Sequence, residues 1–444
     1  MDKLLILLLV ITGFGAVTFA YPLGFLAVLL GAGCCLAAFF FINYYFEGEE
    51  KIFMRRIFII ALILRVILAT VTYVLSLQEF FGGDSVTYDR GGLALYNIWF
   101  GYAQEAQSEF FTDYVSQARG SGWGMAYIVA SIYTIVGRNP FATQLFNCVL
   151  GAATACLTYN CAQKIFRNIR VAKLAAILVA VFPSLILWSS QGLKDGIICF
   201  LLVLAMNAVF SLQKKLDYLN IIILLISLIG IYSLRFYIFF AFVAAVFGSF
   251  FISAEKSAAS IGRQIAVLII VTLGLTYFGV LNNAQESIET YGNLETLQNS
   301  RIDQARTGES GFGQDIDVST SSGALEALPI GLTYIILAPF PWEVENFRQA
   351  ITIPEVLLWW ALIPFMIFGI WYSIKNKFRE SLAVLVFTLL LTVSYAIFQG
   401  NVGTAYRMRA QMQIFYFIFV AVGIVLWKEK RENRQLGRNA RRLR

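Results

Sequence analysis

The chain of 444 residues contains no histidine. This absence excludes Ser-His and Cys-His nucleophile pairs, imidazole metal ligands and the general base that enzymes use most often. Charge is also scarce, because only 14% of the residues are Asp, Glu, Lys or Arg, against 59% hydrophobic residues. The composition is that of a polytopic integral membrane protein. We expect any acid–base chemistry to use carboxylates.

Cysteine offers no alternative chemistry. All six cysteines lie in apolar runs, namely Cys34, Cys35, Cys148, Cys156, Cys161 and Cys199. Neither a disulfide framework nor a zinc site fits that placement. We expect these side chains to be small apolar core residues.

Basic residues exceed acidic residues by 34 to 27, which gives a formal net charge of +7. The excess lies in short loops and in the segment KEKRENRQLGRNARRLR (428–444). Such segments stay on the cytoplasmic side of a membrane and attract anionic lipid. The lipid bilayer is therefore an expected partner, and nucleic acid is not.

Runs of about 20 mostly apolar residues predict transmembrane helices. Twelve such runs occur, at 4–20, 22–45, 57–77, 141–162, 171–190, 196–213, 218–234, 236–253, 264–281, 353–373, 380–398 and 410–427. The first two show no convincing signal-peptide cleavage site, so we expect both to be retained. Twelve spans place every basic loop and both termini in the cytoplasm, in a multi-pass protein of a bacterial inner or plasma membrane.

Two further apolar stretches, 123–136 and 328–341, are short and flanked by Gly, Pro or Trp. Counting either as a span breaks the charge pattern, so both are interpreted as re-entrant or interfacial helices on the outer face. The predicted fold is an all-α polytopic bundle of about 12 transmembrane helices plus these two. No internal repeat is evident.

Six segments remain for the outer face, and they should line one shared surface. They are 78–122, 191–195, 233–237, 282–327, 340–348 and 400–409. Two of them are long, and long loops in compact proteins are usually functional or disordered. The chemistry of the protein is expected on this surface.

The motif GGDSVTYDRGG (82–92) follows the third apolar run. Asp84, held at the boundary of lipid and water, is a candidate base that takes a proton from an acceptor hydroxyl or amine. Helical spacing places Tyr88 on the same face, whereas Asp89 and Arg90 point elsewhere and are expected to pair locally. Helix capping by Asp84 and Asp89, with glycines that only turn the chain, is the structural alternative.

Several cations lie on the outer side, against the positive-inside tendency. They are Lys194, Arg235, Arg348, Arg407 and Arg409. A lipid phosphate or pyrophosphate explains them, because guanidinium groups bind phosphate oxygens bidentately; headgroup anchoring is the alternative. Asp195, in the turn QGLKD (191–195), either orients Lys194 or Arg235 toward the phosphate or caps the next helix.

Other polar features carry weaker signals. Arg65 lies near the middle of a predicted span and requires a partner that the sequence does not identify. The segment 308–329 is rich in Gly, Ser and acid and is expected to be a mobile lid. Asp315 and Asp317 within it are weak evidence for a divalent cation, so no metal or other cofactor is predicted. Glu343, in an aromatic segment, is a further possible substrate contact.

The motif DSVTY, the span NPFATQLFNCVLGAATACLTYNCAQKIF and the segment AAILVAVFPSLILWSSQGLKD together resemble the GT-C glycosyltransferases. The most similar group is family-39-like and includes protein O-mannosyltransferases and lipid A aminoarabinose transferases. The resemblance covers residues 57–215 and, more loosely, NVGTAYRMRAQMQIFYF near the end. In this chain the usual Asp-Glu pair of the first loop is Asp84-Ser85, and two spans precede the family's first helix.

This resemblance implies inverting transfer of a sugar from a polyprenyl-phosphate donor to a glycan, lipid or protein acceptor on the outer, periplasmic face. Carried over by position, Asp84 is the catalytic base and Asp195 the second acidic site. The resemblance assigns no role to Lys194, Arg235 and Arg407. Their phosphate-binding role is inferred from their charge and from their predicted side of the membrane.

The chain then divides into five parts. They are two extra N-terminal helices (1–50), a GT-C-like catalytic module with outer loop 78–122 (51–281), an outer loop with an interfacial helix (282–352), C-terminal helices (353–427) and a basic cytoplasmic tail (428–444). Two other functions stay open. A polymerase or ligase of lipid-linked repeat units would rely on Arg407 and Arg409, and a lipid-linked glycan flippase would need more polar residues inside the bundle.

Overall fold

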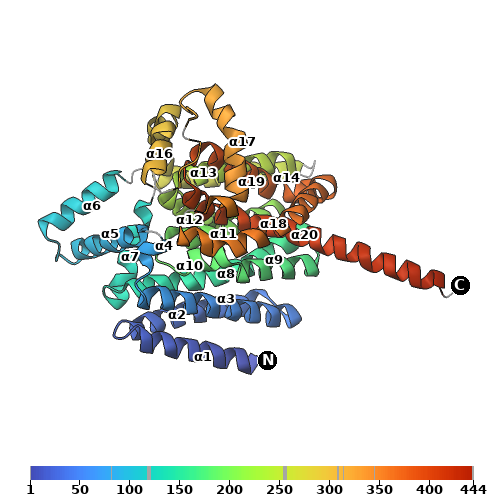
Figure 1. The fold of residues 1–444 in the computed structure, drawn as a ribbon, viewed down its shortest axis with the longest axis horizontal. Coiled ribbons are helices and arrows are strands. Elements are labelled where there is room, and N and C mark those ends of the chain that lie inside the picture. The colour runs from blue at the N-terminus through green and yellow to red at the C-terminus, as the bar shows by residue number, and fades with distance from the viewer. Residues whose placement is uncertain are drawn as a thin grey trace.

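The computed structural model describes residues 2–81, 83–117, 122–253, 258–307, 310–313, 315–344 and 346–442 (Figure 1). Within those ranges the regular structure is helical and no β-strand occurs, apart from one isolated bridge between Gly311 and Asn401. Many of the helices are long and apolar. The protein is thus an all-α polytopic membrane protein, as predicted.

The helices follow one another along the chain as follows. They are α1 (Asp2–Phe19), α2 (Gly24–Tyr45), α3 (Gly48–Val74), α4 (Gln78–Phe81), α5 (Asp84–Trp99), α6 (Glu105–Gln117), α7 (Trp123–Val136), α8 (Pro140–Phe166), α9 (Ile169–Val181), α10 (Pro183–Ser189), α11 (Lys194–Lys214), α12 (Tyr218–Leu234), α13 (Phe236–Ser253), α14 (Ala258–Tyr277), α15 (Val280–Tyr291), α16 (Leu294–Thr307), α17 (Ser321–Leu337), the 3-10 turn η1 (Pro341–Glu343), α18 (Phe347–Asn376), α19 (Phe378–Phe398) and α20 (Val402–Arg442).

Each of the twelve predicted spans corresponds to a helix or to one bent pair. Among the described residues, α2, α3, α8, α11, α14, α18, α19 and α20 are long and apolar enough to cross a membrane. The pair α9 and α10 is a ninth candidate, bent by 58°. The other three predicted spans are the shorter apolar helices α1, α12 and α13, so eight or nine spans satisfy the length criterion instead of twelve. The helices α7 and α17 match the two expected re-entrant or interfacial stretches.

Helix starts follow from local capping chemistry. The Asn139 side chain accepts a hydrogen bond from the N–H of Ala142 at 3.1 Å, and Pro140 occupies the first turn of α8. Asn168 caps α9, Asp217 caps α12 and Asn346 caps α18 in the same way. Asparagine and aspartate are strong N-caps because their side-chain oxygen satisfies an N–H that has no partner within the helix.

The helices α8, α11 and α20 form the centre of the bundle. The apolar windows of α8 and α11 are 78% buried and that of α20 is 83% buried, whereas only 17% of the α2 window is buried. Figure 1 accordingly shows α1 and α2 along one edge of the bundle.

Arg65 stabilises the break between α9 and α10. Pro183 has no N–H to donate to the carbonyl of Val179, four residues earlier, and the chain bends there. The Arg65 guanidinium donates to the Val179 and Ala180 carbonyls at 3.2 and 2.9 Å, and to Ser189 Oγ at 2.8 Å. The intramembrane charge of Arg65 thus satisfies backbone groups released by Pro183, and its role is structural.

The six segments predicted to share one surface are in contact with one another at one end of the bundle, here called the site end. Backbone bonds join Phe312 to Gly400 at 3.0 Å and Val402 to Ser310 at 2.9 Å. Arg348 lies over the Phe80 ring at 5.2 Å. The remaining contacts form the polar network described in the next subsection.

The opposite end of the bundle brings together the basic loops. Arg170 lies 3.9 and 3.7 Å from the carboxylates of Glu429 and Glu432 on α20, and Arg263 donates to the Gln213 carbonyl at 2.7 Å. In Figure 1, α5 and α6 lie at the left end of the bundle and both termini point to the right. Two distinct ends are what the charge pattern predicted.

The long outer segments contain more helix than the sequence suggested. Residues 78–122 include α4, α5 and α6, and residues 282–307 lie in α15 and α16. The predicted mobile segment 308–329 becomes helical at Ser321, because the Thr320 side chain accepts the N–H of Gly323 at 3.1 Å. Residues 308, 309 and 314 of that segment lie outside the described part of the chain, as does Gly82 of the opening motif.

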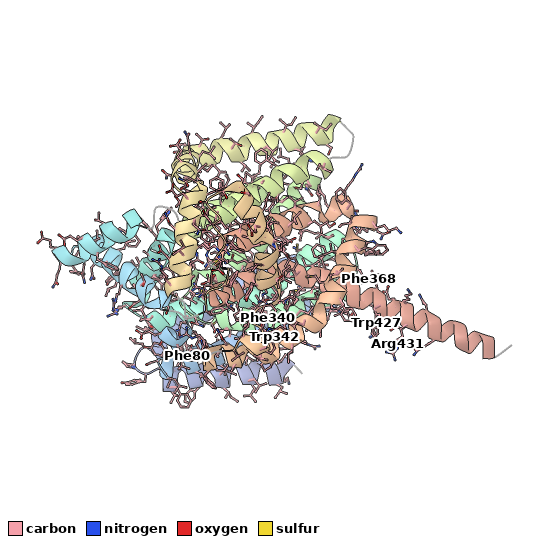
Figure 2. All side chains as sticks on the ribbon, turned by 45° about the horizontal axis from the view of Figure 1, so that its top comes forward. Phe80, Phe340, Trp342, Phe368, Trp427 and Arg431 are labelled. Atoms are coloured by element: carbon pink, nitrogen blue, oxygen red, sulfur yellow. The ribbon has the colours of Figure 1, made fainter. Side chains whose placement is uncertain are left out.

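Aromatic residues gather where α17, η1 and α18 meet. Figure 2 labels Phe340 and Trp342, whose ring centroids are 5.1 Å apart. The Trp342 side chain is largely exposed, and Trp360 donates from its indole to the Leu337 carbonyl at 2.9 Å. Such amphipathic rings are typical of the boundary between lipid and water.

Candidate functional site

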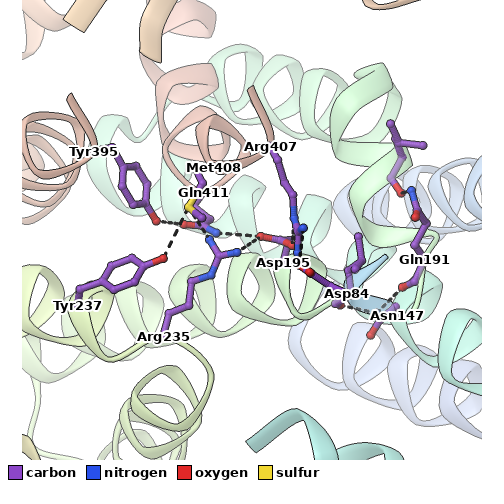
Figure 3. A network of polar contacts seen from close by, with 12 residues as sticks. Asp84, Asn147, Gln191, Asp195, Arg235, Tyr237, Tyr395, Arg407, Met408 and Gln411 are labelled. Carbon is purple, nitrogen blue, oxygen red and sulfur yellow. Dashed lines mark hydrogen bonds and ion pairs between the residues drawn. The ribbon is translucent and has the colours of Figure 1, made fainter. Parts of the chain in front are cut away.

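An unbroken chain of ion pairs joins four distant parts of the sequence at the site end (Figure 3). Arg407 Nη1 lies 2.7 Å from Asp84 Oδ2, and Arg407 Nε lies 2.7 Å from Asp195 Oδ2. Arg235 Nη2 completes the chain at 2.8 Å from Asp195 Oδ1. Each of these four residues comes from a different predicted outer segment, so the expected shared surface exists around them.

Local structure places each of these side chains at a helix end. Asp84 opens α5, Asp195 lies in the first turn of α11, Arg235 separates α12 from α13, and Arg407 lies in the second turn of α20. The N-cap positions of α5 and α11 are Gly83 and Leu193, so neither Asp84 nor Asp195 occupies the N-cap position of its helix. Both carboxylates pair with arginine.

Hydrogen bonds from α8 hold the turn QGLKD in place. Asn147 Nδ2 donates to the carbonyls of Gln191 and Leu193 at 2.6 and 2.8 Å. These bonds hold the backbone immediately before Lys194 and Asp195. The position of Asp195 is therefore set by a buried amide on another helix.

Asp195 is completely buried, and its two oxygens receive hydrogen bonds from three groups. Arg235 and Arg407 supply two of them, and Gln411 Nε2 supplies a third at 3.2 Å. The Tyr395 hydroxyl donates in turn to Gln411 Oε1. A buried carboxylate is stable only when its charge is paired and its lone pairs are satisfied, and both conditions are met here.

Asp84 differs from Asp195 in its access to solvent. Its side chain is 51% exposed, compared with 0% for Asp195 and 13% for Arg407. Only one of its oxygens, Oδ2, takes part in the pair with Arg407. Asp84 is thus a carboxylate that a substrate can reach, backed by a nearly buried cation.

The two arginines retain hydrogen-bonding capacity. Arg407 Nη2 and Arg235 Nε are buried and have no partner among the described residues. The Arg407 guanidinium lies 5.9 Å from the ring centroid of Trp188, and Arg235 Nη1 lies 2.9 Å from the sulfur of Met408. Weakly hydrated guanidinium groups with unused N–H donors are suited to binding an anion.

Lys194 is the third cation of the cluster and interacts electrostatically with all four members of the chain of ion pairs. Its Nζ lies 5.7 Å from the ring centroid of Tyr88. Burial, and next the Asp84 carboxylate, raise the pKa of Tyr88 well above its ordinary value, so its hydroxyl remains protonated. The cluster thus contains three basic side chains and two carboxylates.

Glycine is required where the chain passes Lys194. Gly122 has a φ of +102°, and a Cβ there would lie 2.9 Å from Lys194 Nζ. Any other residue would strain the backbone and displace the amine.

The other predicted site residues lie apart from this cluster. Arg409 is buried, donates to the Ala338 carbonyl and lies over the Tyr406 ring at 5.5 Å. Arg348 is exposed beside Phe80, and Glu343 accepts from the Tyr334 hydroxyl at 3.1 Å. None of these three side chains has a contact with the ion-pair chain among the interactions described here.

The expected local pair of Asp89 and Arg90 is wrong. Asp89 instead accepts a short hydrogen bond of 2.5 Å from the Tyr133 hydroxyl and pairs with Arg138 Nη2 at 2.7 Å. Residues that are adjacent on a helix point about 100° apart, whereas α7 and its C-terminal loop bring Tyr133 and Arg138 to the Asp89 side of α5.

Sequence reasoning missed several members of the network, namely Asn147, Trp188, Tyr237, Tyr395, Met408 and Gln411. Gln411 had a usable signal, because it is a polar residue within an apolar run, one helical turn after Arg407. The aromatic residues had none, since Phe, Tyr and Trp are abundant throughout the chain.

No group of three or more Cys, Asp or Glu side chains comes together as a metal site within the described ranges. Asp317 Oδ1 accepts the N–H of Ser319 at 2.9 Å, and both Asp315 and Asp317 lie in the segment before α17.

No family model and no curated protein matches the sequence. Among solved structures, the chain is similar to the oligosaccharyltransferase of Archaeoglobus fulgidus in its apo form, with 12% identity and a TM-score of 0.42. The alignment covers 72% of this chain and 44% of that one, so the chain spans less than half of that protein's length. The proposed function rests on the site geometry instead.

Proposed function

We propose that this protein is a glycosyltransferase that moves a sugar from a polyprenyl-phosphate donor to an acceptor on the outer, periplasmic face of the membrane, with inversion at the anomeric carbon. The observation that carries the proposal is the contact between the accessible Asp84 carboxylate and Arg407, in a cluster of three basic side chains and two carboxylates. Both termini and the basic loops would then be cytoplasmic, in a bacterial inner or plasma membrane.

Arg407, Lys194 and Arg235 would hold the donor phosphate. Arg407 Nη2 has no partner among the described residues, and the cluster contains one basic side chain more than carboxylates. Preorganised cations lower the barrier because they stabilise the negative charge that develops on the leaving oxygen. Asp195 would keep both guanidinium groups in place, since each is bonded to one of its oxygens.

Asp84 would act as the base. The acceptor oxygen forms its bond to the anomeric carbon while the bond from that carbon to the phosphate oxygen breaks. The acceptor proton passes to the Asp84 carboxylate, and the bonding electron pair leaves with the phosphate. Because the base and the leaving group lie on opposite sides of the anomeric carbon, the configuration inverts. No cofactor is part of this proposal.

The central position of Arg407 also fits a polymerase or ligase of pyrophosphate-linked repeat units. The two functions differ in their donor. In cells that lack the protein, we expect mass spectrometry to show accumulation of a polyprenyl-phosphate monosaccharide, and complementation with the wild-type chain should remove it. Accumulation of complete pyrophosphate-linked repeat units would instead support the polymerase, ligase or flippase.

A further inference from the structure

A cavity of about 390 Å³ lies beside the ion-pair chain, on the other side of α5. Its wall is formed by the end of α3, by α4, α5, α7 and the start of α8, and by the turn before α11. The residues used below are Glu79, Ser85, Tyr88, Thr143, Gln144 and Gly192. Sites for small molecules have volumes of about 300–1,000 Å³, so this cavity is large enough to bind one.

Two buried polar atoms of this wall, Ser85 Oγ and Gln144 Oε1, lack a hydrogen-bond partner among the described residues. The Thr143 hydroxyl, in the same wall, interacts with the Tyr133 hydroxyl. The residues Thr143 and Gln144 are each only 2% exposed. An unsatisfied buried polar group costs about 1–3 kcal/mol, so two in one wall require an explanation. A ligand with hydroxyl groups provides one when these side chains turn toward the cavity, because each hydroxyl both donates and accepts.

The charge of the cavity disfavours an anion. Glu79 and Asp89 line it, whereas no Lys or Arg of the described ranges does. Arg138 is nearby, but it is paired with Asp89. The anion-binding cations Lys194 and Arg407 are outside the wall. A phosphate would therefore bind in the ion-pair cluster, and a neutral or amine-bearing ligand would bind in the cavity.

The same residues separate the cavity from the ion-pair cluster. Ser85 directly follows Asp84, and Tyr88 lines the cavity while its ring faces Lys194. Gly192 belongs to the turn that carries Lys194 and Asp195, and a Cβ there would lie 3.8 Å from Ser85 Cβ. A molecule in the cavity would thus lie next to the helix end that carries Asp84.

We propose that this cavity binds the acceptor, and that the acceptor presents a neutral or amine-bearing sugar ring. That the ligand is the acceptor rests on the proposed function. That the ligand is a neutral or amine-bearing sugar is inferred from the residues of the cavity alone. The rings of Tyr73, Tyr88 and Tyr133 supply apolar faces, and the two unpartnered oxygens of Ser85 and Gln144 supply polar contacts. A hydrocarbon chain would leave those oxygens unsatisfied and is a poorer occupant.

The test measures sugar binding to the full chain in nanodiscs without any donor, by saturation-transfer-difference NMR. The ligands are the methyl glycosides of glucose, mannose, galactose, N-acetylglucosamine and glucosamine, with glucose 6-phosphate as the anionic comparison. We expect at least one uncharged or amine-bearing glycoside to bind. Its affinity should fall about tenfold or more in Gln144→Leu and in Gly192→Leu, since one removes a polar partner and the other fills the space.

Two threonine variants of the same helix provide a matched pair. Thr143→Val removes a hydroxyl from the cavity wall without changing the shape, so it should weaken glycoside binding. Thr158→Val is the control, because the buried Thr158 hydroxyl already donates to the Thr154 carbonyl at 2.9 Å and lies away from the cavity. It should bind the glycosides as the wild type does.

Three results would overturn the proposal: no glycoside binds, the glycosides bind equally to all variants, or glucose 6-phosphate alone competes for the cavity. The protein can bind a glycoside in this assay without transferring a sugar to it. If the expected glycoside dependence appears while cells lacking the protein accumulate no monosaccharide donor, the proposed function fails and the sugar site remains.

Discussion

Replacing Asp84 by asparagine is expected to lower transfer activity by about 10²–10⁴-fold, the usual contribution of a general base. Asparagine has nearly the same shape, but it cannot accept the acceptor proton. The Asp84 side chain is half exposed, so the change should not impair folding or membrane insertion. The measurement is the amount of lipid-linked donor that remains in cells complemented with the variant.

The control for this prediction is Asp315→Asn. Asp315 is also an exposed carboxylate in one of the predicted outer segments, but it has no contact with the ion-pair chain among the interactions described here. It should restore full activity. Wild-type activity in Asp84→Asn would remove Asp84 from the mechanism and leave it as a structural partner of Arg407.

Replacing Asp195 by asparagine is expected to destabilise the fold. The change leaves the buried Arg235 guanidinium without a counter-charge and leaves Arg407 paired with Asp84 alone. Breaking a buried pair in this way typically costs about 3–5 kcal/mol. The unfolding temperature of the purified chain should fall clearly, in contrast to Asp84→Asn.

A second substitution makes this prediction specific. Arg235→Gln, introduced together with Asp195→Asn, removes the arginine that the first change left without an ion pair, and it should recover part of the lost stability. Coupling of this kind is expected only for residues in direct contact. An unchanged unfolding temperature in Asp195→Asn, or strictly additive losses in the double variant, would contradict the assignment of Asp195 as the residue that holds both arginines.

The sequence was sufficient to predict which segments meet at the site end. Hydropathy and loop charge placed Asp84, Asp195, Arg235 and Arg407 on one side of the membrane, and the structure joins all four. Topology alone does not determine which side chains pair. The prediction grouped Arg409 with Arg407, although residues two apart on a helix point about 200° apart around its axis.

The partners that were not predicted depend on tertiary contacts. Arg65 is explained only when Pro183 on another helix is seen to expose the carbonyls of Val179 and Ala180. Asp89 pairs with Arg138 because α7 packs beside α5, and no local rule anticipates that contact. The cavity was also unpredictable, since its wall combines residues from several helices.

The most direct test of the account is turnover of the isolated donor. Polyprenyl-phosphate monosaccharide from cells that lack the protein is added to the full chain in nanodiscs together with a lysate fraction that contains acceptors, and the product linkage is analysed by NMR. The account predicts release of polyprenyl phosphate and a glycosidic bond of inverted configuration, both lost with Asp84→Asn. An untouched donor, or a product of retained configuration, would contradict it.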